Sequence, residues 1–313
     1  MGLKLQTVKE PSFSWRFLLP QYWLVWLGLS LLFLVTLLPL SVLRKLAKVN
    51  TFLLHKLAKK RVNIARTNIA LAFPEMSKNE QAALVNKNIE VAGMALFETA
   101  MGWWWPKRRL QPLLEIEGQE HLEGILAQGK GAFTMALHNM NAEVSLRLLG
   151  LYHPCVAFYR SHNNKLMDYV QYKGRARSNK YLIDKRSSRN LIDALNQGEL
   201  CIYLPDQDYG KRGSIFVPFF GVEKTATLTA CMMFAKRADC IPLMLTTQYT
   251  ATGYKLKFYP PMPDFAEKDE VVALTELNQQ IETMVMEQPE SYLWMHKRFK
   301  TRPEGEPSFY PKK

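Results

Sequence analysis

Acidic residues are missing from a long stretch near the start of this 313-residue chain. No aspartate or glutamate occurs between Pro11 and Pro74, although the stretch contains nine lysines and arginines. Cysteine is also scarce: the four residues at positions 155, 201, 231 and 240 form no C-x-x-C pair. This pattern excludes a disulfide-dense miniprotein and a zinc ribbon, and a reduced domain facing the cytoplasm is the simplest interpretation.

Other missing motifs narrow the classes of function. The chain has no G-x-S-x-G motif, which would mark a serine nucleophile elbow, and its basic stretches carry no recognised nucleic-acid-binding motif. Asp206 and Asp208 form a D-x-D pair, but no glycine-rich phosphate loop accompanies them. We therefore expect no metal, no cofactor and no nucleic acid. The net charge of +13 still indicates an anionic partner, and 48% apolar residues supply a sizeable core.

An uncharged run from Phe17 to Leu43 predicts a transmembrane anchor. A helix over residues 22–43 would be about 33 Å long, enough to cross a hydrocarbon core of about 30 Å. Trp23 and Trp26 lie near its start, where interfacial aromatic residues are common. A buried helix of a soluble core is the alternative.

Basic residues follow this run and predict its orientation. The positive-inside bias places everything after residue 43 in the cytoplasm, where the basic side chains would contact anionic lipid. The residues expected to contact the membrane are Trp23, Trp26, Arg44, Lys45, Lys48, Lys56, Lys59 and Lys60.

Composition divides the chain into five regions. They are an N-terminal tail (1–16), the anchor (17–43), a basic juxtamembrane and helical region (44–112), an α/β core (113–301) and a proline-rich C-terminal tail (302–313). In the helical region, Ser77 and Glu80 form a capping box that predicts a helix over about 78–99. Three adjacent tryptophans, 103–105, are typical either of core packing or of an interfacial patch or acyl-chain contact.

Strand and helix patterns alternate from residue 113 onward. Strands are expected at 113–117, 132–137, 154–159, 200–204, 241–247 and 255–259, and helices at 122–128, 143–149, 164–176, 188–197, 225–238 and 270–287. This alternation predicts an α/β fold with a mixed, mainly parallel sheet flanked by helices.

The strongest candidate site follows the expected strand at 132–137. His138 stands at the strand end and Glu143 in the first turn of the next helix, a place where α/β sheets bind ligands. A carboxylate there can orient an imidazole that takes a proton from a substrate hydroxyl, although a structural histidine would show the same pattern. No Ser or Cys adjoins His138, and Cys201 belongs to a core strand. Direct activation of a hydroxyl is therefore favoured over a covalent intermediate.

Two further polar loops follow strands. An arginine just past a strand end can hold a phosphate or stabilise an oxyanion. For each basic residue farther along, a solvated helix face is the more common outcome, and we expect about a third of them to contact ligand. The two aspartates fit a turn that orders neighbouring arginines better than a metal site. The candidate substrate and oxyanion residues are Arg160, Asn163, Asn164, Arg175, Asp206, Asp208 and Arg212.

These blocks and several others stand in a distinctive order. They are Asn68 with Phe73-Pro74-Glu75, His138 with Glu143, Tyr159–Asn164, Pro205–Asp208, Phe216–Gly221 and Tyr292–Pro303. Together they resemble the late (secondary) lipid A acyltransferases of Gram-negative bacteria. The match is most similar to the Kdo-dependent lipid IVA lauroyltransferase branch, with the myristoyltransferase branch next.

The resemblance implies a glycerolipid-acyltransferase-like fold in a single-pass protein of the bacterial inner membrane, with its catalytic domain in the cytoplasm. It implies transfer of a fatty acyl chain from acyl carrier protein to a hydroxyl of a Kdo2-lipid IVA-type acceptor. His138 would be the base and Glu143 its partner in an HX4E motif, and Arg160 and the Asp206–Asp208 loop would meet substrate. Two alternatives stay open: a different glycolipid or glycerol phosphate acceptor, or a non-catalytic membrane-surface scaffold.

Overall fold

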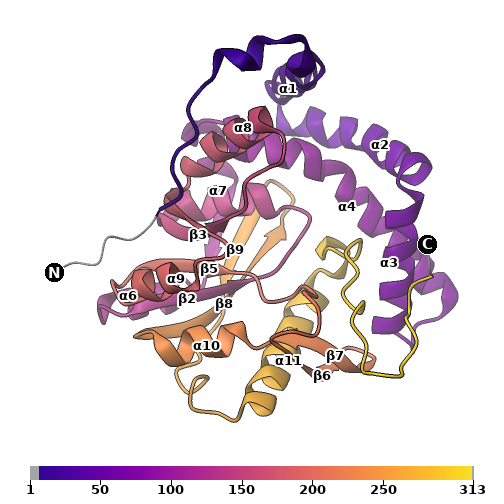
Figure 1. The fold of residues 1–313 in the computed structure, drawn as a ribbon. Helices are drawn as coiled ribbons and strands as arrows, with labels where there is room; N and C mark the ends of the chain where they lie inside the picture. Colours follow the sequence, from indigo (N-terminus) through magenta and orange to yellow (C-terminus); the bar gives the residue numbers. More distant parts are fainter. Residues whose placement is uncertain (1–6, 312–313) are drawn as a thin grey trace.

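The computed structural model describes residues 7–311, which are built around a seven-stranded sheet (Figure 1). Its strands are β1 (Leu114–Glu117), β2 (Gly131–Ala136), β3 (Cys155–Tyr159), β4 (Asn179–Asp184), β5 (Leu200–Tyr203), β8 (Cys240–Tyr249) and β9 (Tyr254–Phe258). They lie in the order β1-β9-β8-β2-β5-β3-β4, and every neighbouring pair is parallel except β8 with β9. The predicted mixed, mainly parallel α/β sheet is confirmed.

Helices cover both faces of the sheet because alternate strand residues point to opposite sides. Ala132 and Ile202 join one core with helices α6 (Gln119–Ala127) and α7 (Ala142–Tyr152). Their chain neighbours face the other side and pack on a second set of helices. That set includes α9 (Ser188–Leu195), α10 (Ala230–Arg237) and α11 (Glu270–Glu287), while α8 (Lys165–Ala176) connects β3 to β4.

A two-stranded hairpin stands apart from the main sheet, and the sequence patterns did not predict it. It consists of β6 (Ser214–Phe219) and β7 (Val222–Leu228). The helix expected at 225–238 is therefore wrong in its first turn, because residues 225–228 belong to β7. The turn is fixed from outside the hairpin, since the Gly221 N–H donates to the Ala72 carbonyl at 3.3 Å.

Within residues 7–311, four long helices and the short α5 (Lys107–Leu110) precede the sheet. The long helices are α1 (Trp23–Thr36), α2 (Leu40–Leu57), α3 (Lys59–Ala72) and α4 (Lys78–Trp104). The Ser77–Glu80 capping box at the start of α4 is confirmed. The helix runs past the expected end at residue 99, and its final turn buries Trp103. Trp105 is buried as well, whereas Trp104 is half-exposed and packs edge-on against Phe33 of α1.

The expected helix over residues 22–43 is wrong as one continuous element, because it breaks between Thr36 and Pro39. At about 1.5 Å per residue, the 14 residues of α1 extend roughly 21 Å. Between residues 7 and 311, no helix combines the length and the apolar character needed to cross a membrane. The N-terminal transmembrane helix is corrected accordingly.

The break has a visible cause. The Thr36 carbonyl, which a continuing helix would use internally, accepts from Trp105 Nε1 at 2.6 Å and from Arg109 Nη1 at 3.0 Å. The second guanidinium nitrogen of Arg109 donates to the Leu38 carbonyl at 2.6 Å. Pro39 has no N–H to return to the preceding turn and stands as the residue before α2. Side chains from the far end of α4 and beyond therefore replace the missing helical hydrogen bonds.

The C-terminal tail packs against the body of the protein. Tyr310 is buried, and its hydroxyl contacts the Asn68 side chain and accepts from the Phe299 N–H at 3.1 Å. The tail thereby connects α3, through Asn68, to the chain around Phe299.

Glu98 of α4 is a fully buried carboxylate between α2 and the β8–β9 hairpin. Its oxygens accept from Tyr254 Oη at 2.8 Å and from Tyr249 Oη at 3.0 Å. Burial raises the pKa of Glu98 to about 7, against the opposing effects of both tyrosines and of Arg44. Arg44 itself donates to the Ala251 and Thr250 carbonyls and so holds α2 beside this group.

The raised pKa of Glu98 predicts that the free energy of unfolding depends on pH. Because the folded-state pKa of Glu98 lies above its ordinary value, its contribution is fully present below about pH 4.5 and is lost as pH rises through 7. The loss is of order 3 kcal/mol, since one pKa unit corresponds to about 1.4 kcal/mol. Thermal unfolding of the wild type and Glu98→Gln between pH 5 and pH 8 measures it. The variant should lose part of the pH dependence, and identical slopes would contradict this account.

Candidate active site

His138 lies where β2 ends, near the middle of the sheet, and its partner comes from the neighbouring strand. Its Nδ1 is 2.6 Å from Asp206 Oδ1, and its backbone N–H donates to Asp206 Oδ2 at 3.0 Å. Asp206 follows β5, which pairs in parallel with β2, so both residues leave the same edge of the sheet. The sequence placed both at strand ends, but did not predict that they bind each other.

The electrostatics of this pair follow from its burial. The Asp206 side chain is 1% exposed and that of His138 is 24% exposed. Burial alone raises the pKa of Asp206, but the His138 ring and the hydrogen bonds from its ring and backbone outweigh burial and lower that pKa overall. With Nδ1 donating to the carboxylate, Nε2 is the acceptor nitrogen. Within residues 7–311 that nitrogen has no hydrogen-bond partner, so it is available to a substrate proton.

Glu143 is not the partner of the imidazole, which corrects the predicted HX4E dyad contact. Both of its carboxylate oxygens contact the Arg175 guanidinium of α8, and Trp103 Nε1 donates to Oε2 at 3.0 Å. The backbones of α4 and α7 are closely packed at this point. Gly102 brings the α4 backbone against the Glu143 backbone, where even a Cβ would lie 2.8 Å from the Glu143 carbonyl. Glu143 and Arg175 therefore form a second polar pair, toward α4 and α8.

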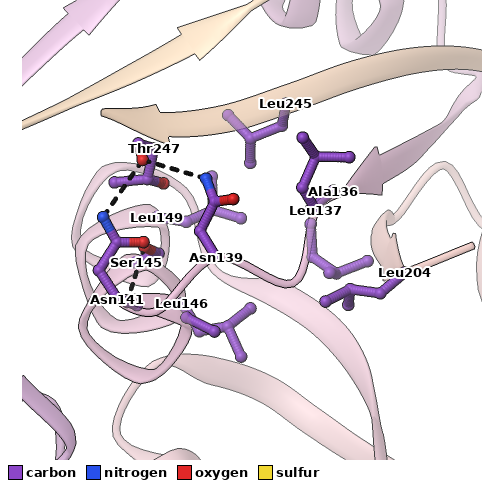
Figure 2. A pocket seen from close by; sticks show the side chains of 12 residues that line it. Ala136, Leu137, Asn139, Asn141, Ser145, Leu146, Leu149, Leu204, Leu245 and Thr247 are labelled. Carbon is purple, nitrogen blue, oxygen red and sulfur yellow. Dashed lines mark hydrogen bonds between the residues drawn. The ribbon is translucent and has the colours of Figure 1, made fainter. Parts of the chain in front are cut away.

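The loop after His138 is fixed by two buried asparagines, shown in Figure 2. The Asn139 amide donates to Thr246 Oγ1 at 3.2 Å and to the Thr247 carbonyl at 3.4 Å. The Asn141 amide reaches the same carbonyl at 3.2 Å (Figure 2). A cavity of about 30 Å³ lies beside them, with a mainly apolar lining from β2, α7, β5 and β8. These bonds attach the loop to β8 and thereby restrict the position of His138.

A C-terminal segment, Tyr292–Thr301, runs across both strand-end loops and is called the strap below. At one end the Tyr292 hydroxyl donates to the Asp206 carbonyl at 3.3 Å. At the other end, Asp208 accepts from the Thr301 N–H at 2.6 Å and from its hydroxyl at 2.7 Å. The Leu293 N–H also donates to the His138 carbonyl at 3.0 Å. The strap thus holds the backbone on both sides of the His138–Asp206 pair.

Two buried asparagines of the N-terminal helices hold the strap in turn. Asn68 of α3 donates to the carbonyls of Trp294 and His296 at 2.7 and 2.6 Å. Asn88 of α4 donates to the carbonyls of Glu290 and Tyr292, each at 2.8 Å. Sequence reasoning did not single out Asn88 or the strap contacts, although an asparagine on the apolar face of a predicted helix is an unusual residue that could have drawn attention to it.

The remaining predicted substrate residues have different surroundings. Asn164 caps α8, because its Oδ1 accepts from the N–H groups of Leu166 and Met167. Asp208 is engaged by Thr301, as described above. Arg160, Asn163 and Arg212 are exposed on the loops that follow β3 and β5. No three His, Cys, Asp or Glu side chains of the described residues are grouped as a metal site would require.

Comparison with known proteins identifies the family. Residues 10–301 match the family model of the bacterial lipid A biosynthesis acyltransferases. The chain belongs to this family. The lipid A biosynthesis lauroyltransferase and palmitoleoyltransferase of Escherichia coli K12 are 40% and 41% identical, each over 96% of this chain and 99% and 98% of their own lengths. The myristoyltransferase of the same strain is 29% identical over 97% of this chain and 95% of its own.

A solved structure is also similar, that of the 1-acyl-sn-glycerophosphate acyltransferase PlsC from Thermotoga maritima. It aligns with 77% of this chain and 97% of its own at a TM-score of 0.35 and 13% identity.

The lipid A acyltransferase has an extended apolar surface on its first two helices. Trp23 is largely exposed, as are several leucines of α1 and α2, among them Leu24 at 82%. Trp26 instead lines a groove of about 410 Å³ between α1, α4 and α8, together with Phe33 and Trp104. The exposed lysines beside this surface are Lys45, Lys48, Lys56, Lys59 and Lys60. Arg44, predicted to contact the membrane, donates to the carbonyls of the β8–β9 turn.

The asparagine contacts predict that the acyltransferase depends on its strap. Asn88→Ala leaves the Glu290 and Tyr292 carbonyls without their donor, which should cost about 1–3 kcal/mol. Chemical denaturation measures this loss, and turnover should fall with it because Tyr292 holds the Asp206 backbone. Asn63→Ala on the exposed face of α3 is the matched control and should change stability by less than about 0.5 kcal/mol. Equal effects of both changes would contradict the role of Asn88.

Proposed function

We propose that this protein transfers a fatty acyl chain from acyl carrier protein to a hydroxyl on a 3-hydroxyacyl chain of a Kdo-bearing lipid A precursor. The observation that carries the proposal is the His138–Asp206 pair, with its free Nε2 at the carboxyl edge of the sheet in a member of the lipid A acyltransferase family. The involvement in lipid A biosynthesis and the class of donor chain are proposed from the activities for which the relatives are named.

The geometry supports general-base catalysis. His138 Nε2 accepts the proton of the acceptor hydroxyl while the oxygen of that hydroxyl forms a bond to the thioester carbonyl carbon. The tetrahedral intermediate collapses by breaking the carbon–sulfur bond, and the imidazolium returns the proton to the departing thiolate. Asp206 fixes the tautomer through Nδ1 and stabilises the imidazolium. The products are the ester and the free thiol of the carrier protein.

A covalent acyl-enzyme is disfavoured by the surroundings of the cysteines. Cys201 is fully buried in β5, and burial raises the pKa of its thiol well above the ordinary value. No Ser or Cys side chain of the described residues hydrogen-bonds to His138. Direct attack by the acceptor hydroxyl therefore fits the site better than a two-step mechanism.

Basic groups around the site fit an anionic acceptor. Arg160 is exposed just beyond β3, and its charge acts on Tyr209 beside Asp206. We assign Arg160 and Arg212 to phosphate, Kdo carboxylate or carrier-protein contacts. We assign Arg175, which is held by Glu143, to stabilising the developing oxyanion. Glu143 then acts by positioning Arg175.

The donor chain is proposed to lie in the apolar groove between α1, α4 and α8. Its lining includes Leu29, Phe33 and Trp104, which offer an apolar surface to a hydrocarbon chain. Trp103, the residue before Trp104, donates to Glu143, so the groove lies beside the Glu143–Arg175 pair. The relatives at 40% and 41% identity are a lauroyl- and a palmitoleoyltransferase, which favours these chains over myristoyl.

We further propose that the protein works at the cytoplasmic surface of the bacterial inner membrane. The exposed apolar residues of α1 and α2 would insert into the interface, and the neighbouring lysines would contact anionic lipid headgroups. This arrangement places the groove at the level from which a lipid acceptor enters.

Purified protein should acylate Kdo2-lipid IVA with lauroyl-, palmitoleoyl- and myristoyl-carrier protein offered side by side, with mass spectrometry of the product as the readout. His138→Ala and Asp206→Asn should each lower turnover by about 10²–10⁴, the usual cost of removing a general base or its orienting group. Asp184→Asn, an exposed aspartate at the end of β4, is the matched control. Near-normal turnover of both site variants would refute the assignment.

Membrane contact has its own test. Leu24→Asp combined with Leu31→Asp places two charges on the exposed face of α1 and should reduce flotation with vesicles of phosphatidylethanolamine and phosphatidylglycerol several-fold. Val271→Asp changes an exposed residue of α11, on the far side of the molecule in Figure 1, and should float normally. Higher salt should weaken wild-type binding, since each lysine near the bilayer contributes about 1 kcal/mol. Unchanged flotation of the double variant would contradict this surface.

A further inference from the structure

Arg298 is a buried cation in the middle of the strap. It is 2% exposed, and its guanidinium donates to the Ala226 carbonyl at 2.7 Å and to Thr227 Oγ1 at 3.3 Å. The group also lies over the Phe219 ring, 4.7 Å from its centroid. Its Nε has no hydrogen-bond partner, and no carboxylate of the described residues lies within ion-pair distance of it. Its direct contacts are thus neutral, which leaves its charge without an immediate counterion.

A guanidinium stays ionised even when buried, so its charge must be balanced over a longer distance. Asp206 and Asp208 are the buried carboxylates whose charges act on Arg298, and the strap that carries Arg298 is bonded to both of these residues, through Tyr292 and Thr301. Burial lowers the pKa of Arg298, whereas Tyr292 and these two carboxylates act in the opposite direction. The side chain therefore interacts electrostatically with the base of the proposed reaction through Asp206.

We propose that Arg298 is a positioning residue that balances the two buried aspartates and keeps His138 from retaining its proton. Asp206, Asp208 and Arg298 together carry one net negative charge, which a protonated His138 neutralises. Without Arg298 the aspartates carry two negative charges against the imidazolium, which would hold the proton more tightly. The inference rests on the proposed function, because it concerns the proton that His138 removes from the acceptor.

Other titratable groups around the cluster do not replace Arg298. Burial raises the pKa of Tyr292 and of Tyr310, so both phenols stay neutral at working pH. Burial and the neighbouring His138 lower the pKa of His296, which favours its neutral form near pH 7. The cationic side chains of Lys300 and Arg160 act on the cluster from exposed positions, where solvent screens them. Arg298 is the buried cation of the cluster.

An NMR titration of the His138 imidazole in the full chain, without substrate, tests the proposal. The signal is assigned by its absence from the spectrum of His138→Gln. In Arg298→Met the midpoint of the titration should rise by about one to two pH units, as expected when a buried unit charge acting on the pair is removed at an effective dielectric constant of about 20. The acidic limb of the kcat/KM profile should move by the same amount, so activity at pH 7 falls about tenfold or more and recovers at higher pH.

Three variants separate charge from structure. Arg298→Lys keeps the charge and should keep most of the wild-type midpoint, even where Arg298→Met folds poorly. Adding Asp208→Asn to Arg298→Met removes one charge of each sign and should bring the midpoint back toward wild type. Arg302→Met is the matched control, since Arg302 follows the strap directly in the sequence and forms an ion pair with Glu306.

The proposal is overturned if Arg298→Met titrates like the wild type, or if Arg298→Lys shifts as far as Arg298→Met. Failure of the proposed function gives a different result. In that case His138 still titrates as described, while no variant and no wild-type sample transfers an acyl chain at any pH.

Discussion

A carboxylate shielded from water and bound to an imidazole is the interaction on which the rest of the site depends. Asp206 has lost almost all contact with solvent, so its charge is tolerated only because the His138 ring and backbone both donate to it. Two such bonds need the loops after β2 and β5 at a fixed separation. Parallel strands deliver the loops to one edge of the sheet, but strand pairing alone does not hold the loop backbones in place.

The strap supplies that restraint, and it makes distant parts of the chain depend on one another. Its two ends contact Asp206 and Asp208, while Asn68 and Asn88 bond to its backbone from helices more than 200 residues earlier in the sequence. Helices α3 and α4 are therefore part of the site's support and not a separate attachment to the α/β core. Each asparagine is itself buried, so the strap and the helices stabilise each other only when both are in place.

The sequence patterns placed His138 and Asp206 at the ends of their strands but did not predict their contact. His138 and Asp206 were found because a polar residue directly after an apolar run is a local signal. Their contact spans 68 residues, whereas Glu143 lies only five residues from His138 and so seemed the natural partner. The partners that Glu143 has instead, Arg175 and Trp103, lie 32 and 40 residues away in the sequence, so no local pattern contains these contacts. The hairpin β6–β7 was missed for a similar reason, because its turn is bonded to α3 rather than formed by its own residues alone.

The same long-range control explains the broken apolar run. Hydropathy and length favoured one helix over residues 22–43, but Trp105 and Arg109 bind the carbonyls of Thr36 and Leu38 and stabilise the break. The consequence reaches the site, because the turned α1 packs Phe33 against Trp104 and forms one wall of the apolar groove. Trp103, the preceding residue, donates to Glu143 instead. Adjacent residues at the end of α4 thus face an apolar groove and a charged pair, so a chain lying in the groove would end beside groups that can act on its polar head.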